Sequence, residues 1–362
     1  MKLPQLTFTR FIAAAFVLIY HYGQQAYPFN LPIVTDIVQV GNIGVSYFFV
    51  LSGFILVISQ IREEQLPGRV SAGGFWIHRF ARVYPMYLFA FVFHLFLVVS
   101  DPTPTESLTA FKVLSCITLL QAWFPSMVMK LNSPGWSLSA EAFFYALFPI
   151  VYFVFKNIPR RGAIVVGVVL WGLLTLVCER LMHVGFNAYF IYTAPILHLG
   201  PFLLGMGTAF FFIESPELVL RWRIHLGLAS FGGTALALWL IVTHHPLVPL
   251  AHNGLFAPLF ALLILALSGS TGRISRLFAS PWGQYLGDIS YSLYIMQVPV
   301  WILVSAILRH GVTLDRGIQF YVYLPVIILV SAAGFRWVEV PWRRRIRQWG
   351  EAWLTRRNQR TA

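Results

Sequence analysis

The stretch from Thr7 to Tyr22, TFTRFIAAAFVLIYHY, has the composition of a membrane-spanning helix that carries one arginine, Arg10, and one histidine, His21. They are eleven positions apart, close to three whole turns, so we expect both side chains on one helix face, about 16 Å apart along the axis. Ionisable groups in a bilayer are costly and face a protein interior or a water-filled cavity. The stretch therefore predicts a polar groove along this helix. The alternative is an Arg10 that snorkels to the interface and a His21 that only makes a structural hydrogen bond.

The composition predicts an all-α, polytopic membrane protein. The 362 residues are 58% hydrophobic and only 11% charged, and the mean hydropathy is +0.71, whereas soluble domains contain about a quarter charged residues. The net charge of +13 is interpreted as a topology signal, because basic loops stay in the cytoplasm, and not as a sign of nucleic-acid binding. Cys116 and Cys178 lie in apolar runs and suggest neither a disulfide framework nor a metal site.

Ten apolar runs approach spanning length, and we expect both termini in the cytoplasm. In this topology all but five of the 26 Lys and Arg residues lie in inner loops or at inner helix ends. A further run at about 108–124 is expected to be re-entrant or interfacial. The five outer basic residues are Lys112, Lys130, Arg180, Arg309 and Arg316; the ten predicted spans are about 8–26, 40–60, 83–100, 136–155, 162–182, 193–213, 224–243, 253–269, 285–308 and 318–338.

Two arginines precede the third predicted span in the sequence FWIHRFARVYP. Arg79 and Arg82 are three residues apart and share a face if the helix begins here. Such a pair suits a phosphate-bearing ligand, because guanidinium groups bind phosphate as a fork-shaped clamp. The alternative is a basic topology signal at the cytoplasmic interface.

An acid follows in SPGWSLSAEAFFYALFP, which spans Ser133 to Pro149. Glu141 is expected near the start of the fourth span, at membrane depth and near the outer face. A carboxylate there can be explained by the helix dipole. An intramembrane acid is also a candidate functional residue, and we favour this second interpretation.

The C-terminal part adds further polar residues. Asp288 is expected near the inner interface, and Arg336 is expected to pair with Glu339. Residues 341–362 form a basic, tryptophan-bearing tail that should lie along the anionic inner leaflet, after a membrane domain at 1–340. His244, His245 and His252 lie close in sequence, but they have no acid nearby, and no metal is expected.

Five ordered stretches resemble the acyltransferase-3 family of integral membrane acyltransferases. The resemblance covers nearly the whole chain, although 160–270 matches only in hydropathy. Many relatives have a histidine where this chain has Gln297, and no fused esterase-like domain is expected. The stretches are Arg10 with His21, GVSYFFVLSGF, RFARVYP, WSLSAEAFFYALFP, and GDISYSLYIMQVPV with VEVPWRR.

The resemblance implies transfer of an acyl group, usually acetyl from acetyl-CoA on the cytoplasmic side, to a hydroxyl of a glycan. The acceptor would be a surface polysaccharide or a lipid-linked saccharide, and the location a bacterial inner membrane. The family's essential pair corresponds to Arg10 and His21, its Arg-x-x-Arg to Arg79 and Arg82, and its WSLSxE acid to Glu141. We expect no metal cofactor and no nucleic-acid partner.

The residues themselves suggest a mechanism. A neutral imidazole at His21 suits a general base, although an acyl-histidine intermediate is an open alternative. Arg79 and Arg82, followed by Tyr84, are candidates to bind CoA, and Arg10 would continue that path.

Glu141 would orient His21 or position the acceptor. The competing function is a transporter or flippase for a lipid-linked saccharide, and a sensor or scaffold is a third. Transporters often have internal repeats, whereas the ionisable residues here concentrate in the first 141 positions. This pattern favours the enzyme.

Overall fold

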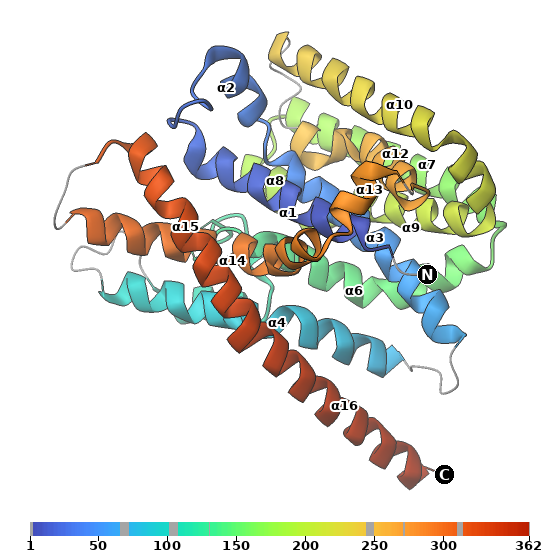
Figure 1. Cartoon of the computed structure of the whole chain (residues 1–362). Coiled ribbons are helices and arrows are strands. Elements are labelled where there is room, and N and C mark those ends of the chain that lie inside the picture. The colour runs from blue at the N-terminus through green and yellow to red at the C-terminus, as the bar shows by residue number, and fades with distance from the viewer. Residues whose placement is uncertain are drawn as a thin grey trace.

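The computed structural model describes residues 3–65, 72–100, 108–129, 131–243, 250–270, 272–309 and 314–361, and these residues contain helices and no strand (Figure 1). Short 3-10 or π segments join several helices. The α-helices are α1 (Gln5–Leu18), α2 (Pro32–Val38), α3 (Ile43–Glu64), α4 (Ala72–Ser100), α5 (Ala110–Ile117), α6 (Gly135–Lys156), α7 (Arg160–His183), α8 (Ala188–Thr193), α9 (Leu199–Glu214), α10 (Pro216–Thr243), α12 (Ala257–Ser268), α13 (Arg273–Phe278), α14 (Pro281–Arg309), α15 (Arg316–Gly334) and α16 (Val340–Thr361).

Nine helical segments in the described part of the chain are long and apolar enough to cross a membrane, which confirms the all-α, multi-pass fold. One of the ten predicted spans, 253–269, does not reach this length. This region forms α12, which has only 12 residues. Its helix cannot extend further back because Gly254 has a φ of +105°, a left-handed conformation that ends regular α-helix. The indole N–H of Trp171 donates a hydrogen bond of 2.7 Å to the Gly254 carbonyl and so holds this break.

The run at 108–124 is not a spanning helix. It contains the eight-residue helix α5 and the short 3-10 turn η2 (Gln121–Trp123). The chain then contacts the middle of α14, where the Asn132 side-chain amide donates a hydrogen bond of 3.3 Å to the carbonyl of Ile295. Helix α6 begins beside this point, so the segment before it penetrates to mid-height of the helix bundle. This geometry agrees with the prediction of a re-entrant segment.

Helix α1 lies in the centre of the molecule, in direct backbone contact with two neighbours (Figure 1). A Cβ atom added at Gly287 of α14 would lie 2.1 Å from the Thr7 carbonyl oxygen, and one added at Gly44 of α3 would lie 2.7 Å from that of Ala13. Small residues permit such approach between membrane helices. The two glycines therefore fix the position of α1 between α3 and α14.

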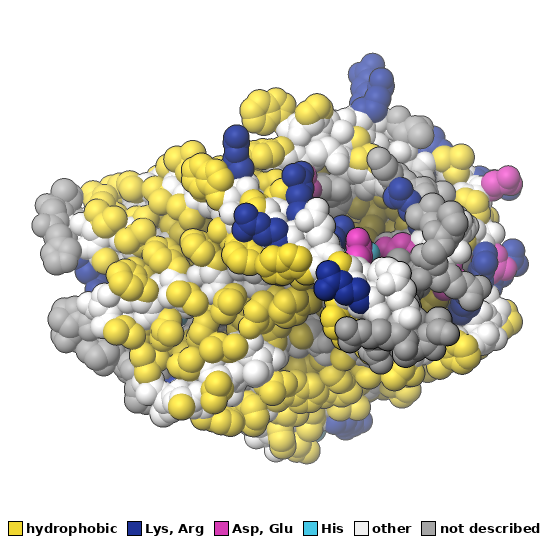
Figure 2. Space-filling model, turned by 90° about the horizontal axis from the view of Figure 1, so that it is seen from below, with side chains coloured by type: hydrophobic (Ala, Val, Ile, Leu, Met, Phe, Trp, Pro, Cys, Tyr) yellow, Lys and Arg dark blue, Asp and Glu magenta, His cyan; other side chains and the backbone are white. Residues whose placement is uncertain are grey.

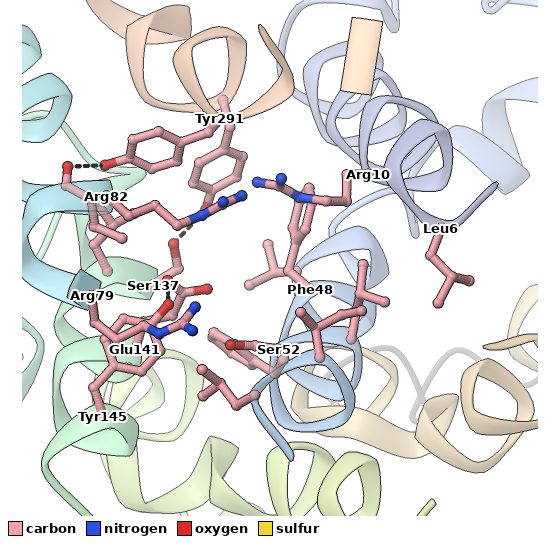
Figure 3. Close-up of a pocket in the computed structure, with 18 of the residues that line it drawn as sticks. Leu6, Arg10, Phe48, Ser52, Arg79, Arg82, Ser137, Glu141, Tyr145 and Tyr291 are labelled. Atoms are coloured by element: carbon pink, nitrogen blue, oxygen red, sulfur yellow. Dashed lines mark hydrogen bonds between the residues drawn. The ribbon is translucent and has the colours of Figure 1, made fainter. Parts of the chain in front are cut away.

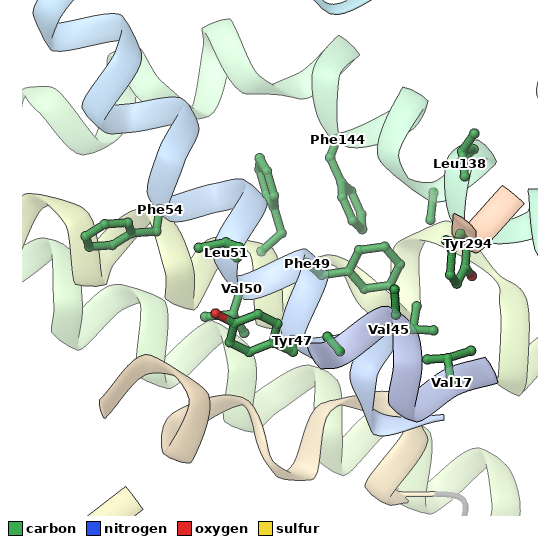
Figure 4. Packing of buried hydrophobic residues seen from close by; sticks show 14 of the residues in the cluster. Val17, Val45, Tyr47, Phe49, Val50, Leu51, Phe54, Leu138, Phe144 and Tyr294 are labelled. Carbon is green, nitrogen blue, oxygen red and sulfur yellow. The ribbon is translucent and has the colours of Figure 1, made fainter. Parts of the chain in front are cut away.

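Helices α3 and α9 cross at a reciprocal pair of glycines. A Cβ at Gly53 would lie 2.1 Å from the carbonyl oxygen of Phe202, and one at Gly205 would lie 2.0 Å from that of Val50. Buried aromatic rings fill the space beside this crossing (Figure 4). Phe49 of α3 packs edge-on against Phe144 of α6 at a centroid distance of 5.2 Å. Gly44 and Gly53 therefore both permit close backbone contact of α3 with a neighbouring helix.

The C-terminal helix α16 continues from α15 through the π segment η6 (Phe335–Glu339) and extends beyond the body of the molecule (Figure 1). It packs along the first turns of α4, where His78 Nε2 and Glu351 Oε1 are 3.1 Å apart. The predicted pair of Arg336 with Glu339 is wrong. Glu339 accepts a hydrogen bond of 3.4 Å from Arg343, one α-helical turn onward, whereas Arg336 is exposed.

The surface has the distribution of a membrane protein. In the view of Figure 2, hydrophobic side chains cover the left and middle of the face, while most visible Lys and Arg side chains lie in the right half, several around a hollow. Exposed rings such as Phe96, Phe153 and Trp239 contribute to the apolar surface. A soluble monomer rarely exposes such large apolar patches, which supports burial of this surface in lipid.

The glycine crossing makes a testable prediction about stability. Gly205→Val places a side chain on the backbone of α3, and we expect it to lower the melting temperature of the purified protein strongly, because overpacking costs about 1–3 kcal/mol or more. Gly232→Val is the control, since nothing lies within 4 Å of a Cβ at Gly232. Equal melting temperatures for the two variants in nanodiscs would contradict the packing at this crossing.

Candidate active site: two cavities at opposite ends of helix α1

The groove expected along α1 is not continuous. The regular α-helix ends at Leu18, and the next five residues, Ile19–Gly23, form a π-helical segment. A wider turn changes the angular position of the residues that follow. Arg10 and His21 line two different cavities, and between them the α1 residues Ala13, Ala14, Val17 and Leu18 are buried in the core.

The first cavity, called here the Arg10 cavity, has a volume of about 280 Å³. Four helices supply its charged and phenolic side chains, and Figure 3 shows that Arg10, Arg82 and Glu141 point into a shared space. The arginines come from α1 and α4, and the acids and phenols come from α6 and α14. The charged and phenolic lining residues are Arg10, Arg79, Arg82, Glu141, Tyr145, Asp288, Tyr291 and Tyr294.

Three guanidinium groups in this cavity lack a matching set of carboxylates. Arg79 donates to Ser59 Oγ at 3.1 Å, and its buried Nε has no hydrogen-bond partner. Within the described residues, Arg10 and Arg82 form no hydrogen bond or ion pair. Since buried charges are costly without a partner, this cluster is suited to an anionic ligand. As predicted, Arg79 and Arg82 share one helix, α4, and the structure brings both into one cavity with Arg10.

Glu141 lies at the Arg10 end of the molecule and does not contact His21. Its carboxylate accepts a hydrogen bond of 2.8 Å from the Tyr145 hydroxyl. Because α6 begins at mid-height, its first turns bring Glu141 into the same cavity as Arg10. In the expected topology, which places Arg10 at the inner end of its helix, this position differs from the expected one near the outer face. The helix dipole is also a poor explanation, since the first turn of α6 contains no acidic residue and the dipole effect falls off within that turn.

Tyr84 is not among the residues that line the Arg10 cavity. Its hydroxyl donates 3.0 Å to the carbonyl of Ile117, at the end of α5. Its ring stacks on Phe80 at 4.4 Å and lines a separate, largely apolar hollow. Tyr84 therefore anchors the re-entrant segment to α4.

Several lining residues escaped the sequence analysis as members of a site. On α6, Ser137 and Tyr145 lie four residues before and after Glu141, and on α14, Tyr291 and Tyr294 follow Asp288 at intervals of three. Residues at these spacings share a helix face. This periodicity of polar side chains within apolar runs is the sequence signal that could have identified them as site residues.

The second cavity, called here the His21 cavity, has a volume of about 610 Å³. It lies at the other end of α14 and of the helix that begins with α1. His21 comes eleven residues after Arg10, and the lining residues on α14 begin at Trp301, thirteen residues after Asp288. The His21 side chain is exposed to this cavity. The lining residues are His21, Tyr22, Gln24, Gln25, Trp301, Ser305, Leu308, Arg309, Leu314, Arg316 and Gln319.

The hydrogen bonds around His21 determine its tautomer. The Gln297 side-chain N–H donates a hydrogen bond of 2.9 Å to the carbonyl of Tyr294. This identifies the other polar atom of the amide as the oxygen Oε1, which can only accept. His21 Nδ1 lies 3.0 Å from this Oε1 and must therefore be the protonated nitrogen. In the neutral ring the other nitrogen, Nε2, then has a lone pair, as a general base requires.

A chain of polar contacts connects the two cavities. Ser137 Oγ and Tyr294 Oη, both on the Arg10 cavity, are 2.9 Å apart. The backbone of Tyr294 holds Gln297, which contacts His21. Tyr323 fixes the same turn of α14 by donating 3.0 Å to the carbonyl of Gln297. The layer between the cavities thus contains hydrogen-bonded groups around Tyr294 and Gln297.

No group of three or more His, Cys, Asp or Glu side chains in the described residues is placed to hold a metal ion. His252 instead lies with its Nε2 2.9 Å from the carbonyl of Tyr192, and His198 Nε2 approaches the same carbonyl at 2.9 Å. His244 and His245 lie outside the described residues.

Comparison with known proteins adds to this geometry. The family model described as an acyltransferase domain matches residues 3–336. The chain belongs to the acyltransferase-3 family. Its described helices, both cavities and the residues Arg10, His21, Arg79, Arg82 and Glu141 all lie within or against this domain.

Two of the similar proteins are described as an acyltransferase and an O-acetyltransferase. Acyltransferase MdmB of Streptomyces mycarofaciens is 33% identical over 168 residues, or 44% of this chain and 42% of that protein. Peptidoglycan O-acetyltransferase OatA of Listeria monocytogenes is 24% identical over 84% of this chain and 51% of its own length. The chain spans about half the length of the curated relatives it matches. No solved structure matches significantly.

The tautomer of His21 can be tested without any assumption about activity. We expect ¹⁵N NMR of histidine-labelled protein, assigned by comparison with His21→Gln, to show His21 as the neutral Nδ1–H form. Gln297→Leu should shift this resonance towards the other tautomer, because the acceptor on Nδ1 is lost. A His21 signal of the Nε2–H form in the unmodified protein would refute the assigned hydrogen bond.

Proposed function

We propose that this acyltransferase-3 protein is an O-acyltransferase that moves an acetyl group from acetyl-CoA to a hydroxyl of a glycan acceptor. The observation that carries the proposal is the separation of Arg10 and His21 into two cavities with different chemistry. Three guanidinium groups, none of which forms an ion pair with a described residue, lie in a cavity at one end. An exposed imidazole, whose Nδ1 contacts Gln297, lies in a cavity at the other. The first suits a polyphosphate donor and the second suits activation of a hydroxyl.

The donor is assigned to the Arg10 cavity. Arg79 and Arg82, one turn apart on α4, would clamp the phosphates of CoA, since planar guanidinium groups bind phosphate in a bidentate way. Arg10 faces them across the cavity from α1 (Figure 3) and would extend the anion site towards the core. The buried, partnerless Nε of Arg79 is a donor that a phosphate oxygen can satisfy.

Glu141 is proposed to position the arginines. It lies in the same cavity as the three arginines, and its carboxylate is held by Tyr145. An acid among several cations lowers their mutual repulsion, and the two acids of this cavity, Glu141 and Asp288, do not neutralise its three arginines. Glu141 is therefore not assigned the role of orienting His21, which Gln297 performs in this geometry.

His21 is the proposed general base. Its Nε2 would accept the proton of the acceptor hydroxyl while that oxygen bonds to the acetyl carbonyl carbon. The carbon–sulfur bond then breaks, and the proton passes from the imidazolium to the departing thiolate sulfur, so that the products are an acetyl ester and CoA–SH. The same free Nε2 is also the atom that an acyl-histidine route would use.

The acyl end of the donor must reach from the first cavity to the second. Arg10 and His21 are eleven residues apart on α1, about 16 Å along a helix. The intervening layer contains the Ser137–Tyr294 contact and Gln297. We propose that the pantetheine arm passes Tyr294, which borders the Arg10 cavity and belongs to the same hydrogen-bonded turn as Gln297.

The proposed topology places the Arg10 cavity on the cytoplasmic side of the bacterial inner membrane and the His21 cavity on the outer side. This is the orientation that leaves most Lys and Arg residues inside. Helix α16, with Trp342, Trp349 and Trp353, would then contact the inner leaflet. A surface polysaccharide or lipid-linked saccharide could reach His21 from outside. A carrier would use the same cavities, but membership of an acyltransferase family favours group transfer.

The donor assignment predicts that Arg79→Gln and Arg82→Gln each weaken CoA binding roughly 10- to 100-fold, because each removes a charged hydrogen-bond donor. Isothermal titration of CoA against protein in nanodiscs measures this effect. Arg276→Gln is the matched control, since Arg276 is exposed on α13 and does not line the Arg10 cavity. Equal affinity in all four proteins would remove the basis for the donor site.

The base assignment predicts a different pattern. His21→Gln should bind CoA normally but lose slow acetyl-CoA hydrolysis and transfer by about 10²–10⁴-fold. Gln297→Leu should lower kcat by about 10²-fold through misplacement of the ring, with CoA affinity unchanged. Gln297→Glu should restore most activity because it retains an acceptor for Nδ1. Release of thiol from acetyl-CoA is the readout, and full turnover in His21→Gln would overturn the assignment.

A further inference from the structure

The His21 cavity has a charge that its proposed catalytic role does not require. Arg309 at the end of α14 and Arg316 at the start of α15 both line it. Both side chains are exposed, and within the described residues neither forms an ion pair or a hydrogen bond. The described lining of this cavity contains no Asp or Glu. The acid nearest in sequence, Asp315, uses its carboxylate to cap α15, accepting 2.7 Å from the N–H of Gly317.

A structural role explains only one of these two arginines. Arg309 occupies the last turn of α14, where a cation is favourable with the helix dipole. Arg316 is the first residue of α15, where the dipole disfavours a cation. The proposed topology also assigns only five basic residues to the outer side, and two of them line this one cavity. Because basic residues are depleted there, their convergence indicates a ligand.

The remaining lining suits a sugar ring. Trp301 stacks on Tyr22 at 4.6 Å and meets Tyr323 edge-on at 5.2 Å, so its indole is held rigidly in the cavity wall. Ser305 accepts a hydrogen bond from Gln319, which leaves its own O–H able to donate. Gln24 donates 2.7 Å to the carbonyl of Tyr20, so its amide oxygen is available to accept. A flat aromatic surface with a few placed polar groups is typical of small-ligand sites.

We propose that the His21 cavity selects a glycan acceptor that carries an anionic group, a carboxylate or a phosphate, and that Arg309 and Arg316 are its specificity-determining residues. The anionic group would lie between the two guanidiniums at the mouth. A hydroxyl on the same or the adjacent sugar would then lie against His21. This inference rests on the proposed function for the acetyl transfer, but the charge selectivity of the cavity can be measured separately from it.

The test uses the full chain in nanodiscs of phosphatidylcholine, so that no anionic lipid competes. Trigalacturonate is compared by isothermal titration with its fully methyl-esterified form, which has the same sugars without the charge, and glucose 1-phosphate represents the phosphate source. We expect the anionic trisaccharide to bind at least tenfold more tightly than the ester. The preference should shrink with added salt, because exposed charges are screened. Tighter binding of only one anion identifies which group the cavity prefers.

Two variant pairs show whether the arginines cause the preference. Arg309→Gln/Arg316→Gln should bind trigalacturonate and its ester equally, whereas Arg309→Lys/Arg316→Lys should retain most of the preference and so controls for folding. Arg180→Gln removes another predicted outer arginine, which is exposed and does not line the cavity, and should behave as the unmodified protein. An unmodified protein that binds neither anion more tightly than the ester, or a Gln pair that keeps the preference, overturns the inference.

Acetyl-CoA hydrolysis in the same samples separates this inference from the proposed function. The Arg180→Gln protein should hydrolyse acetyl-CoA at the unmodified rate, because Arg180 is exposed and lines neither cavity. Charge-selective glycan binding without any binding or hydrolysis of acetyl-CoA would refute the acyltransferase proposal and leave the anionic ligand class standing. Acetyl transfer to neutral and anionic glycans at equal rates would refute the charge selectivity and leave the acyltransferase proposal standing.

Discussion

The close contact of α1 with its neighbours is the constraint on which the rest of the structure depends. Gly287 and Gly44 let the backbones of α14 and α3 approach α1 without an intervening side chain. In a bilayer, helices gain little from burying apolar surface against one another, so close packing of this kind supplies much of the specificity. A helix held so tightly on two sides can carry Arg10 at one end and His21 at the other in fixed positions.

The polar groups within the bundle are arranged by charge. At the Arg10 end, three cations and two acids face one space, and the excess of positive charge is available to a ligand. At the other end, His21 is held by the neutral amide of Gln297. A neutral partner fixes the orientation of the ring without the strong charge stabilisation that a carboxylate would give to the imidazolium. The imidazole is thereby set apart from Glu141 and Asp288, which lie with the arginines.

Mid-height entry of α6 connects these two regions. Because the chain from α5 to α6 turns back inside the bundle, Ser137 meets Tyr294 near the middle of α14. The same arrangement carries Glu141 into the Arg10 cavity. In a helix that crossed the whole bilayer from the outer surface, this acid would lie closer to the His21 end. The re-entrant segment thus determines that Glu141 lies beside the arginines and not beside His21.

Sequence by itself determined the all-α membrane class, most spans, the family and the candidate functional residues. These follow from local properties: apolar length, charge bias, and motifs such as Arg79-x-x-Arg82. Only the tertiary structure decided that Arg10 and His21 line separate cavities, that Glu141 lies with the arginines, that Glu339 pairs with Arg343, and that Gln297 orients the imidazole. These outcomes depend on a π-helical turn, on the depth at which α6 begins and on contacts between residues up to 276 positions apart. Helical periodicity describes only one helix at a time, so it contains no information on these distances.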